Sequence, residues 1–419
     1  MNSMLALAAD LPSILAIDVP NTTLPQSAVA VVVAVLLLVG SRMERSNARL
    51  VISLLALGGL LAGMIALPLT TPAPMGDYHN FAEEGRAAFE ERFVGSTRFQ
   101  FHLAGAATGV VDAVLGRPDP AVTFDVMAAA VSALFVGGLT ALGFWGRWSA
   151  QVIRYIALAT LVPITVLFFG YHEFGHLPLA FIAPAIPLVL VGIDTGNYRE
   201  VIAGSFMLGV GAAMHGFGLV ALLYAWLLIA LAWKLLGPSS TTLPAAHGMP
   251  RTLQIFGAGV VGWLGWFGAY AVVLGIDVYA DHASSRVWRR TFTASFEEDN
   301  LRINYPVFSG KVITDLAFEF GIVGAAALLL VPSVSHRLRK PVLLASIPVL
   351  AFTVWFWPVG GLGGDTDNMG AMVVPFFAAA WLISSSRRLT LVGGSLLLLG
   401  HFALLRVLTT GQFVETQLR

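Results

Sequence analysis

Long apolar stretches separated by polar connections dominate the chain. About 20 apolar residues are enough for a helix to cross the hydrocarbon core of a bilayer. Stretches near this length are the predicted spans: 25–41, 50–69, 122–145, 152–170, 177–193, 200–213, 216–235, 253–276, 315–334, 341–357, 371–386 and 389–408. The pattern predicts an all-α polytopic membrane protein with about 11–12 transmembrane helices, because the short stretch at 200–213 leaves the count open.

The segments between the predicted spans differ in length. Two are large, at 70–121 and 277–314, and we expect them to carry amphipathic helices; a third, at 358–370, is shorter. Residues 1–24 are apolar but interrupted, which is typical of an interfacial segment. No basic region precedes them, so we expect no cleaved signal peptide. The chain is interpreted as a single transmembrane domain over 1–419.

Basic residues occupy alternate connections between the predicted spans. They are Arg42, Arg45, Arg49, Arg147, Arg199, Lys234, Arg251, Arg337, Arg339, Lys340, Arg387 and Arg388. The positive-inside rule assigns such connections to the cytoplasm. Both termini and the segments at 70–121, 277–314 and 358–370 are therefore predicted to lie outside. Unusual polar residues gather in these outer segments, which predicts a functional site at the outer membrane face.

Composition supports a membrane protein and narrows its chemistry. The chain is 57% hydrophobic and only 11% charged, too few charged residues for the surface of a soluble protein of this size. Its formal net charge of zero argues against nucleic acid as a partner. Cysteine is absent, so disulfides and thiolate metal sites are excluded, and a metal would need His, Asp or Glu ligands.

The string His172-Glu173-Phe174-Gly175-His176 matches HExxH, a zinc-binding signature. Zinc binding requires both histidines on one face of a helix, and Pro178 disfavours a helix through this string. We predict a turn at 170–176, with Pro178 in the first turn of the following helix. No later segment has the form of the third-ligand segment of intramembrane site-2 proteases. A zinc metalloprotease remains an alternative interpretation.

Several segments, in order, resemble bacterial membrane glycosyltransferases of the GT-C superfamily. MGDYHNF at 75–81 resembles the acidic motif of the first outer loop, and FHLAGAATGVVDAVLGRPDPAVTF at 101–124 resembles its return segment. LFFGYHEFGHLPLAF at 167–181 resembles an FFGYxE string at the outer end of a span. GVGAAMHGFGLV, YPVFSGKVITDLAFEFGIVG and GGLGGDTDNMGAMVVPFFAAAWL resemble later segments. Together they cover roughly residues 50–390, and the additional span at 25–41 departs from the family pattern.

The resemblance implies a function at the outer face of a bacterial plasma membrane. Such enzymes transfer a sugar from a polyprenyl-phosphate donor, here to a lipid or cell-envelope glycan acceptor, with inversion. The expected partners are this donor, this acceptor and membrane lipids. The chemistry needs a carboxylate that accepts the acceptor's hydroxyl proton, and groups that stabilise the charge on the leaving phosphate.

Asp77 occupies the motif position and is the candidate general base; its alternative role is the N-cap of a helix at 78–92. His79 either orients this base, contacts phosphate or is a solvated loop residue. Glu173 either contacts sugar or acceptor or pairs with an arginine. His215, flanked by glycines, is a candidate substrate contact or a satisfied core histidine.

Arg302 and Lys311 are the best-placed candidates for stabilising the leaving phosphate. The alternatives are Arg86, Arg98, Arg289 and Arg290. Asp365 and Asp367 form a D-x-D pair, which we expect to bind sugar or to order its loop. A lipid-phosphate donor requires no cofactor, although a divalent metal at this pair is possible. No metal ligand is therefore assigned.

A transporter or flippase of lipid-linked intermediates is the other alternative. Such a protein would carry inverted repeats and charged or broken helices near the middle of the membrane. The chain has no clear internal repeat, and its polar residues gather at one predicted face. The pattern therefore favours an enzyme with an outer site.

Overall fold

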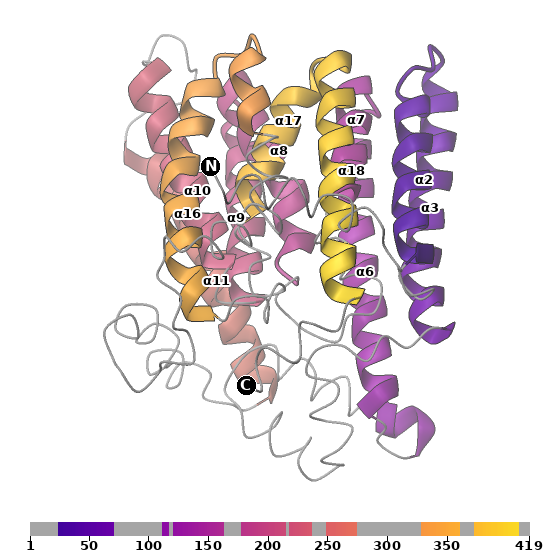
Figure 1. The fold of residues 1–419 in the computed structure, drawn as a ribbon. Helices are drawn as coiled ribbons and strands as arrows, with labels where there is room; N and C mark the ends of the chain where they lie inside the picture. Colours follow the sequence, from indigo (N-terminus) through magenta and orange to yellow (C-terminus); the bar gives the residue numbers. More distant parts are fainter. Residues whose placement is uncertain are drawn as a thin grey trace, which may run out of the picture.

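The computed structural model describes residues 24–70, 111–116, 120–162, 177–214, 218–236, 249–274, 328–360 and 373–409. Within these ranges the regular elements are all helical (Figure 1). The α-helices are α2 (Leu24–Gly40), α3 (Ser46–Thr70), α6 (Pro120–Trp145), α7 (Ala150–Thr160), α8 (Leu179–Thr195), α9 (Tyr198–Met214), α10 (Gly218–Leu236), α11 (Met249–Leu274), α16 (Arg339–Gly360), α17 (Val374–Ser384) and α18 (Arg387–Thr409). A short 3₁₀ helix, η4 (Val331–Ser333), precedes α16.

The helices run side by side and alternate in direction, forming one bundle (Figure 1). At one flank α7 packs against α2, α6, α17 and α18. At the other flank α9 packs against α8, α10 and α11, and α10 packs against α16. Contacts of α8 with both α6 and α17 join the two flanks.

The predicted helical fold is confirmed for the part of the chain that the structure describes. A helix lies at each predicted span except 315–334, most of which falls outside the described ranges. Three helices contain stretches long and apolar enough to cross a membrane, namely Ser46–Ala66, Ala128–Trp145 and Gly218–Leu236. The N-terminal segment and the greater part of 70–121 and all of 277–314 also lie outside those ranges.

Large apolar side chains are exposed on the outer surface of the bundle. Leu55 of α3 is 70% exposed, Val261 of α11 60% and Ile347 of α16 59%. The interior is apolar as well, with Phe135, Tyr155 and Phe377 fully buried. A bundle that is apolar both inside and outside is poorly suited to water, since each exposed apolar side chain adds unfavourable hydration.

The predicted start of a helix at Pro178 is confirmed. Pro178 has helical angles (φ −58°, ψ −27°) immediately before α8. Its carbonyl oxygen accepts hydrogen bonds from the backbone N–H groups of Phe181 (3.0 Å) and Ile182 (2.9 Å). Proline suits this position because the first N–H groups of a helix have no partner within the helix.

Glycines allow the backbones of α8, α9 and α11 to touch. A methyl group at Gly209 of α9 would overlap the carbonyl oxygen of Gly259 in α11, and one at Gly262 would overlap the carbonyl oxygen of Phe206. On the opposite side of α9, a methyl group at Gly204 would lie 3.0 Å from the carbonyl oxygen of Ala185 in α8. Small residues at helix crossings permit this close packing, a principal source of association between helices in lipid.

We expect Gly209→Ala to destabilise the bundle by about 1–3 kcal/mol, because the new methyl group meets backbone atoms that cannot turn aside. The matched control is Gly257→Ala in α11, where a methyl group meets nothing within 4 Å. That change should be neutral or stabilising by up to about 1 kcal/mol, since alanine favours a helix over glycine. Thermal unfolding of the purified variants in detergent measures both, and equal melting temperatures would contradict the packing.

Candidate functional site

The candidate site residues from the sequence lie outside the residues that the structure describes. They are Asp77, His79, Glu173, His215, Arg302, Lys311, Asp365 and Asp367. The HExxH string at 172–176 lies outside as well, so its zinc interpretation stays untested. The structure does describe the ends of the helices that adjoin the segments carrying these residues.

Two of these helices are short and end inside the bundle. α7 and α17 have 11 residues each, so each is about 16 Å long, against about 39 Å for the 26 residues of α6. The residues at their inner ends are buried, with Val162 after α7 1% exposed and Val373 before α17 2% exposed. The segments containing Glu173 and Asp365 therefore join the bundle at buried positions.

Side-chain contacts place these helix ends at a similar level along the bundle. The hydroxyl of Tyr155 in α7 donates a hydrogen bond to the carbonyl oxygen of Ala183 in α8. The ring of Tyr155 packs edge-on against Trp381 of α17, with centroids 5.5 Å apart. From these three residues the helix ends are four to seven positions away, or about 6–10 Å, in the same direction.

The junction between α9 and α10 adjoins the same region. A methyl group at Gly211 of α9 would lie 3.5 Å from the carbonyl oxygen of Pro178, and one at Gly218 of α10 would overlap the backbone of Gly211. His215 follows α9 directly, and Glu173 precedes Pro178 by five positions. The helix ends closest in sequence to Glu173 and His215, the start of α8 and the end of α9, are thus neighbours in the bundle.

Three of the converging ends are helix N-termini, those of α8, α10 and α17. None of them has an acidic residue in its first turn, and neither the N-cap of α8 nor that of α17 contributes a side-chain hydrogen bond. The first N–H groups of a helix lack partners within the helix, and the helix dipole makes this end favourable for an anion. The arrangement can stabilise negative charge, such as that on a phosphate.

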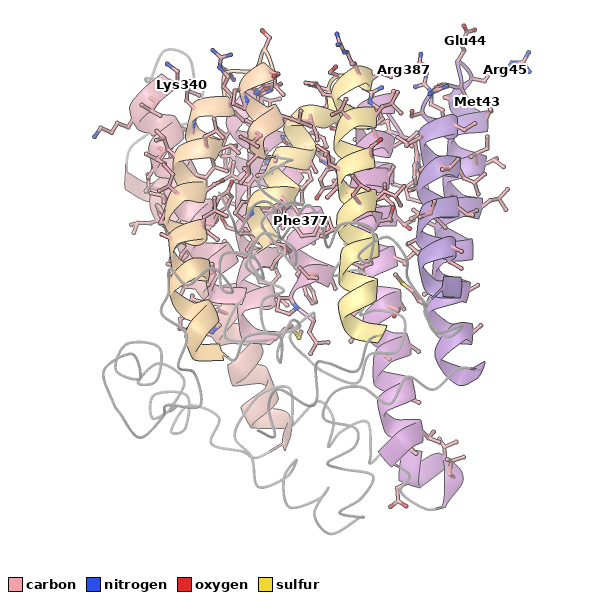
Figure 2. The ribbon with its side chains drawn as sticks, viewed as in Figure 1. Met43, Glu44, Arg45, Lys340, Phe377 and Arg387 are labelled. Carbon is pink, nitrogen blue, oxygen red and sulfur yellow. The ribbon has the colours of Figure 1, made fainter. Side chains whose placement is uncertain are left out.

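The basic connections lie at the opposite end of the bundle. Arg45 between α2 and α3, Lys340 at the start of α16 and Arg387 at the start of α18 share this end (Figure 2). The ends of α6, α8 and α10 reach it as well (Figure 1). The sequence expectation that alternate connections share one side agrees with this geometry.

An ion-pair cluster at the basic end joins α8 to the start of α16. Arg337 Nε donates to Asp194 Oδ1 at 2.6 Å, and Arg337 Nη2 donates to the backbone carbonyl of Asp194. His336 Nε2 lies 3.7 Å from Asp194 Oδ2, and His336 Nδ1 accepts a hydrogen bond from Leu338 N–H at 3.2 Å. Burial lowers the pKa of His336, Asp194 opposes this shift, and Arg337 adds to it. This cluster was not predicted from the sequence. The available signal was an acidic and a basic residue in connections of the same predicted side.

Within the described residues there is no group of three or more potential metal ligands. Comparison with protein-family models, curated proteins and solved structures finds no match.

We expect the melting temperature of the protein to fall between pH 7.5 and 5.5, in part through His336. Because its folded-state pKa is lowered, the unfolded chain binds more protons near pH 6.5, and stability is lost as the pH falls through that range. His336→Gln removes this contribution and should show a smaller fall in melting temperature. An identical fall in both proteins would contradict the assignment.

Proposed function

We propose that the chain is a polytopic membrane glycosyltransferase of a bacterial plasma membrane. It transfers a sugar from a polyprenyl-phosphate donor to a lipid or cell-envelope glycan acceptor, with inversion, at the extracytoplasmic face. The observation that carries the proposal is the convergence of buried helix ends next to the segments that bear Glu173, His215, Asp365 and Asp367. The resemblance of those segments to the GT-C superfamily supplies the chemistry.

Membrane insertion is supported by the exposed apolar side chains and by the three helices long and apolar enough to span a bilayer. We propose about 11–12 spans in all. With basic connections at one end of the bundle, the positive-inside rule assigns that end to the cytoplasm. The converging helix ends then face away from the cytoplasm, toward the side where lipid-linked sugars are used.

In the proposed reaction the Asp77 carboxylate accepts the proton of an acceptor hydroxyl. The hydroxyl oxygen attacks the anomeric carbon from the side opposite the phosphate, and the bond to the phosphate oxygen breaks. The C–O bond electrons leave with the polyprenyl phosphate, and inversion follows from attack on the opposite face.

Other groups hold the reactants and the developing charge. Arg302 and Lys311 stabilise the leaving phosphate, and the N-terminal ends of α8, α10 and α17 favour an anion through their helix dipoles. The remaining proposed substrate contacts are His79, Glu173, His215, Asp365 and Asp367. The proposal requires no metal, because the donor carries a lipid phosphate in place of a nucleotide.

Two described features favour this function over the alternatives. Pro178 begins α8, which disfavours the continuous helix that an HExxH zinc site needs. In the described helices Asp, Glu, Lys and Arg lie within about two turns of a helix end, whereas a flippase is expected to carry charged residues near the middle of the membrane.

We expect Asp77→Asn to lower transfer about 10²–10⁴-fold, because the amide cannot accept the hydroxyl proton. The matched control is Asp112→Asn, which makes the same chemical change in the short described stretch 111–116 of the same predicted loop and should retain activity. The assay presents purified protein with a panel of polyprenyl-phosphate sugars, and metal content is measured on the same samples. Absence of transfer with every donor, together with one bound zinc per chain, would contradict the proposed function and favour the protease.

A further inference from the structure

The basic end of the bundle has two sides that differ in their acidic residues. On the side built by α2, α3, α6, α7, α17 and α18, exposed arginines lie in the α2–α3 connection, in the α6–α7 connection and at the start of α18. They are Arg42, Arg45, Arg147, Arg387 and Arg388, and we refer to them as the arginine patch. Within the described part of the chain none of these side chains has an ion-pair partner, and Glu44 is the single acid in these connections.

The other side of the same end is partly neutralised. Arg337 pairs with Asp194. Arg339 and Lys340 at the start of α16 are exposed on this side. Arg339 and Lys340 can therefore serve as a control pair of basic residues, in surroundings that are less strongly positive than the arginine patch.

The arginine patch is carried on turns held by internal hydrogen bonds. Arg154 of α7 donates through Nε to the carbonyl oxygen of Ser384 at 2.7 Å and through Nη2 to that of Ser385 at 3.4 Å. Arg49 of α3 donates to the carbonyl oxygens of Met43 and Glu44. The helices α2, α6, α17 and α18 all contact α7. Arg45 and Arg387 lie at the same end of the bundle (Figure 2). The exposed arginines therefore lie at one end of the bundle, on turns held by hydrogen bonds.

Exposed apolar side chains lie within about one helical turn of each arginine connection. Val39 of α2 is 44% exposed, Phe144 of α6 57% and Leu391 of α18 42%. The charged backbone of a nucleic acid would leave these apolar side chains uncovered. An anionic phospholipid can contact both kinds of side chain, with its charged headgroup at the arginines and its acyl chains at the exposed apolar residues.

We propose that the arginine patch binds the headgroups of anionic phospholipids in preference to zwitterionic ones. The inference rests on the membrane insertion in the proposed function and is independent of the glycosyl transfer. Several guanidinium groups surround the phosphate of one or two lipids, while the α16 start, beside the Asp194–Arg337 pair, attracts them less.

The test compares three purified proteins in detergent: the wild type, Arg387→Gln/Arg388→Gln, and the control Arg339→Gln/Lys340→Gln. Each is titrated with phosphatidylglycerol, with phosphatidylcholine and with inorganic phosphate, and the rise in melting temperature gives an apparent affinity. We expect phosphatidylglycerol to stabilise the wild type and the control with similar affinity. The arginine-patch variant should bind it at least about 10-fold more weakly, and 0.5 M salt should weaken wild-type binding.

Equal stabilisation by phosphatidylcholine, full stabilisation by inorganic phosphate alone, or the same loss in both double variants would overturn the proposal. If the lipid-free melting temperature of the arginine-patch variant falls, native mass spectrometry of the folded proteins replaces the thermal assay. It compares the lipid retained by the same three proteins, and the same results support or overturn the proposal. Flotation of the wild type with lipid vesicles separates the two proposals. Failure to float contradicts membrane insertion, whereas flotation without a preference for phosphatidylglycerol contradicts only the arginine patch.

Discussion

Backbone contact through glycine at α9 is the constraint on which the bundle depends. Gly209 brings α9 against α11, and Gly204 brings its other side against α8. Inside a bilayer, burial of apolar surface gives little advantage over contact with lipid, so close packing takes a larger share of helix association. A β-carbon at Gly209 would push two backbones apart, with no flexible side chain to absorb the change.

The same packing sets the geometry of the candidate site. Since α9 lies directly against α8, its last turn at Gly211 adjoins Pro178, where α8 begins. Tyr155 ties the short helix α7 to α8 and α17 at one level. The buried ends of these helices consequently meet within the bundle. Three of them are helix N-termini, at the end away from the basic residues. The proposed phosphate chemistry rests on this placement.

Helix positions followed from the sequence because they depend on local features. Apolar runs and Pro178 predicted α8 to within two residues at each end, and the basic connections predicted which helix ends share a side. Contacts between distant segments could not be predicted in this way. The Asp194–Arg337 pair and the packing of Gly211 against Pro178 depend on which helices become neighbours, and hydrophobic patterning along one helix does not specify its neighbours. The roles of Asp77, Arg302 and Lys311 stay predictions, since these residues lie outside the described ranges.

An extracytoplasmic site requires that the two ends of the bundle lie on opposite sides of the membrane. The absence of native cysteine makes this sidedness measurable. Single cysteines at His79, His215 and Asp367, and at Arg45 and Arg387, are exposed in intact cells to a maleimide that cannot cross the membrane. We expect labelling at the first three positions in intact cells and at the last two only after permeabilisation. Labelling of all five from the same side, or of the arginine positions alone in intact cells, would contradict an extracytoplasmic site.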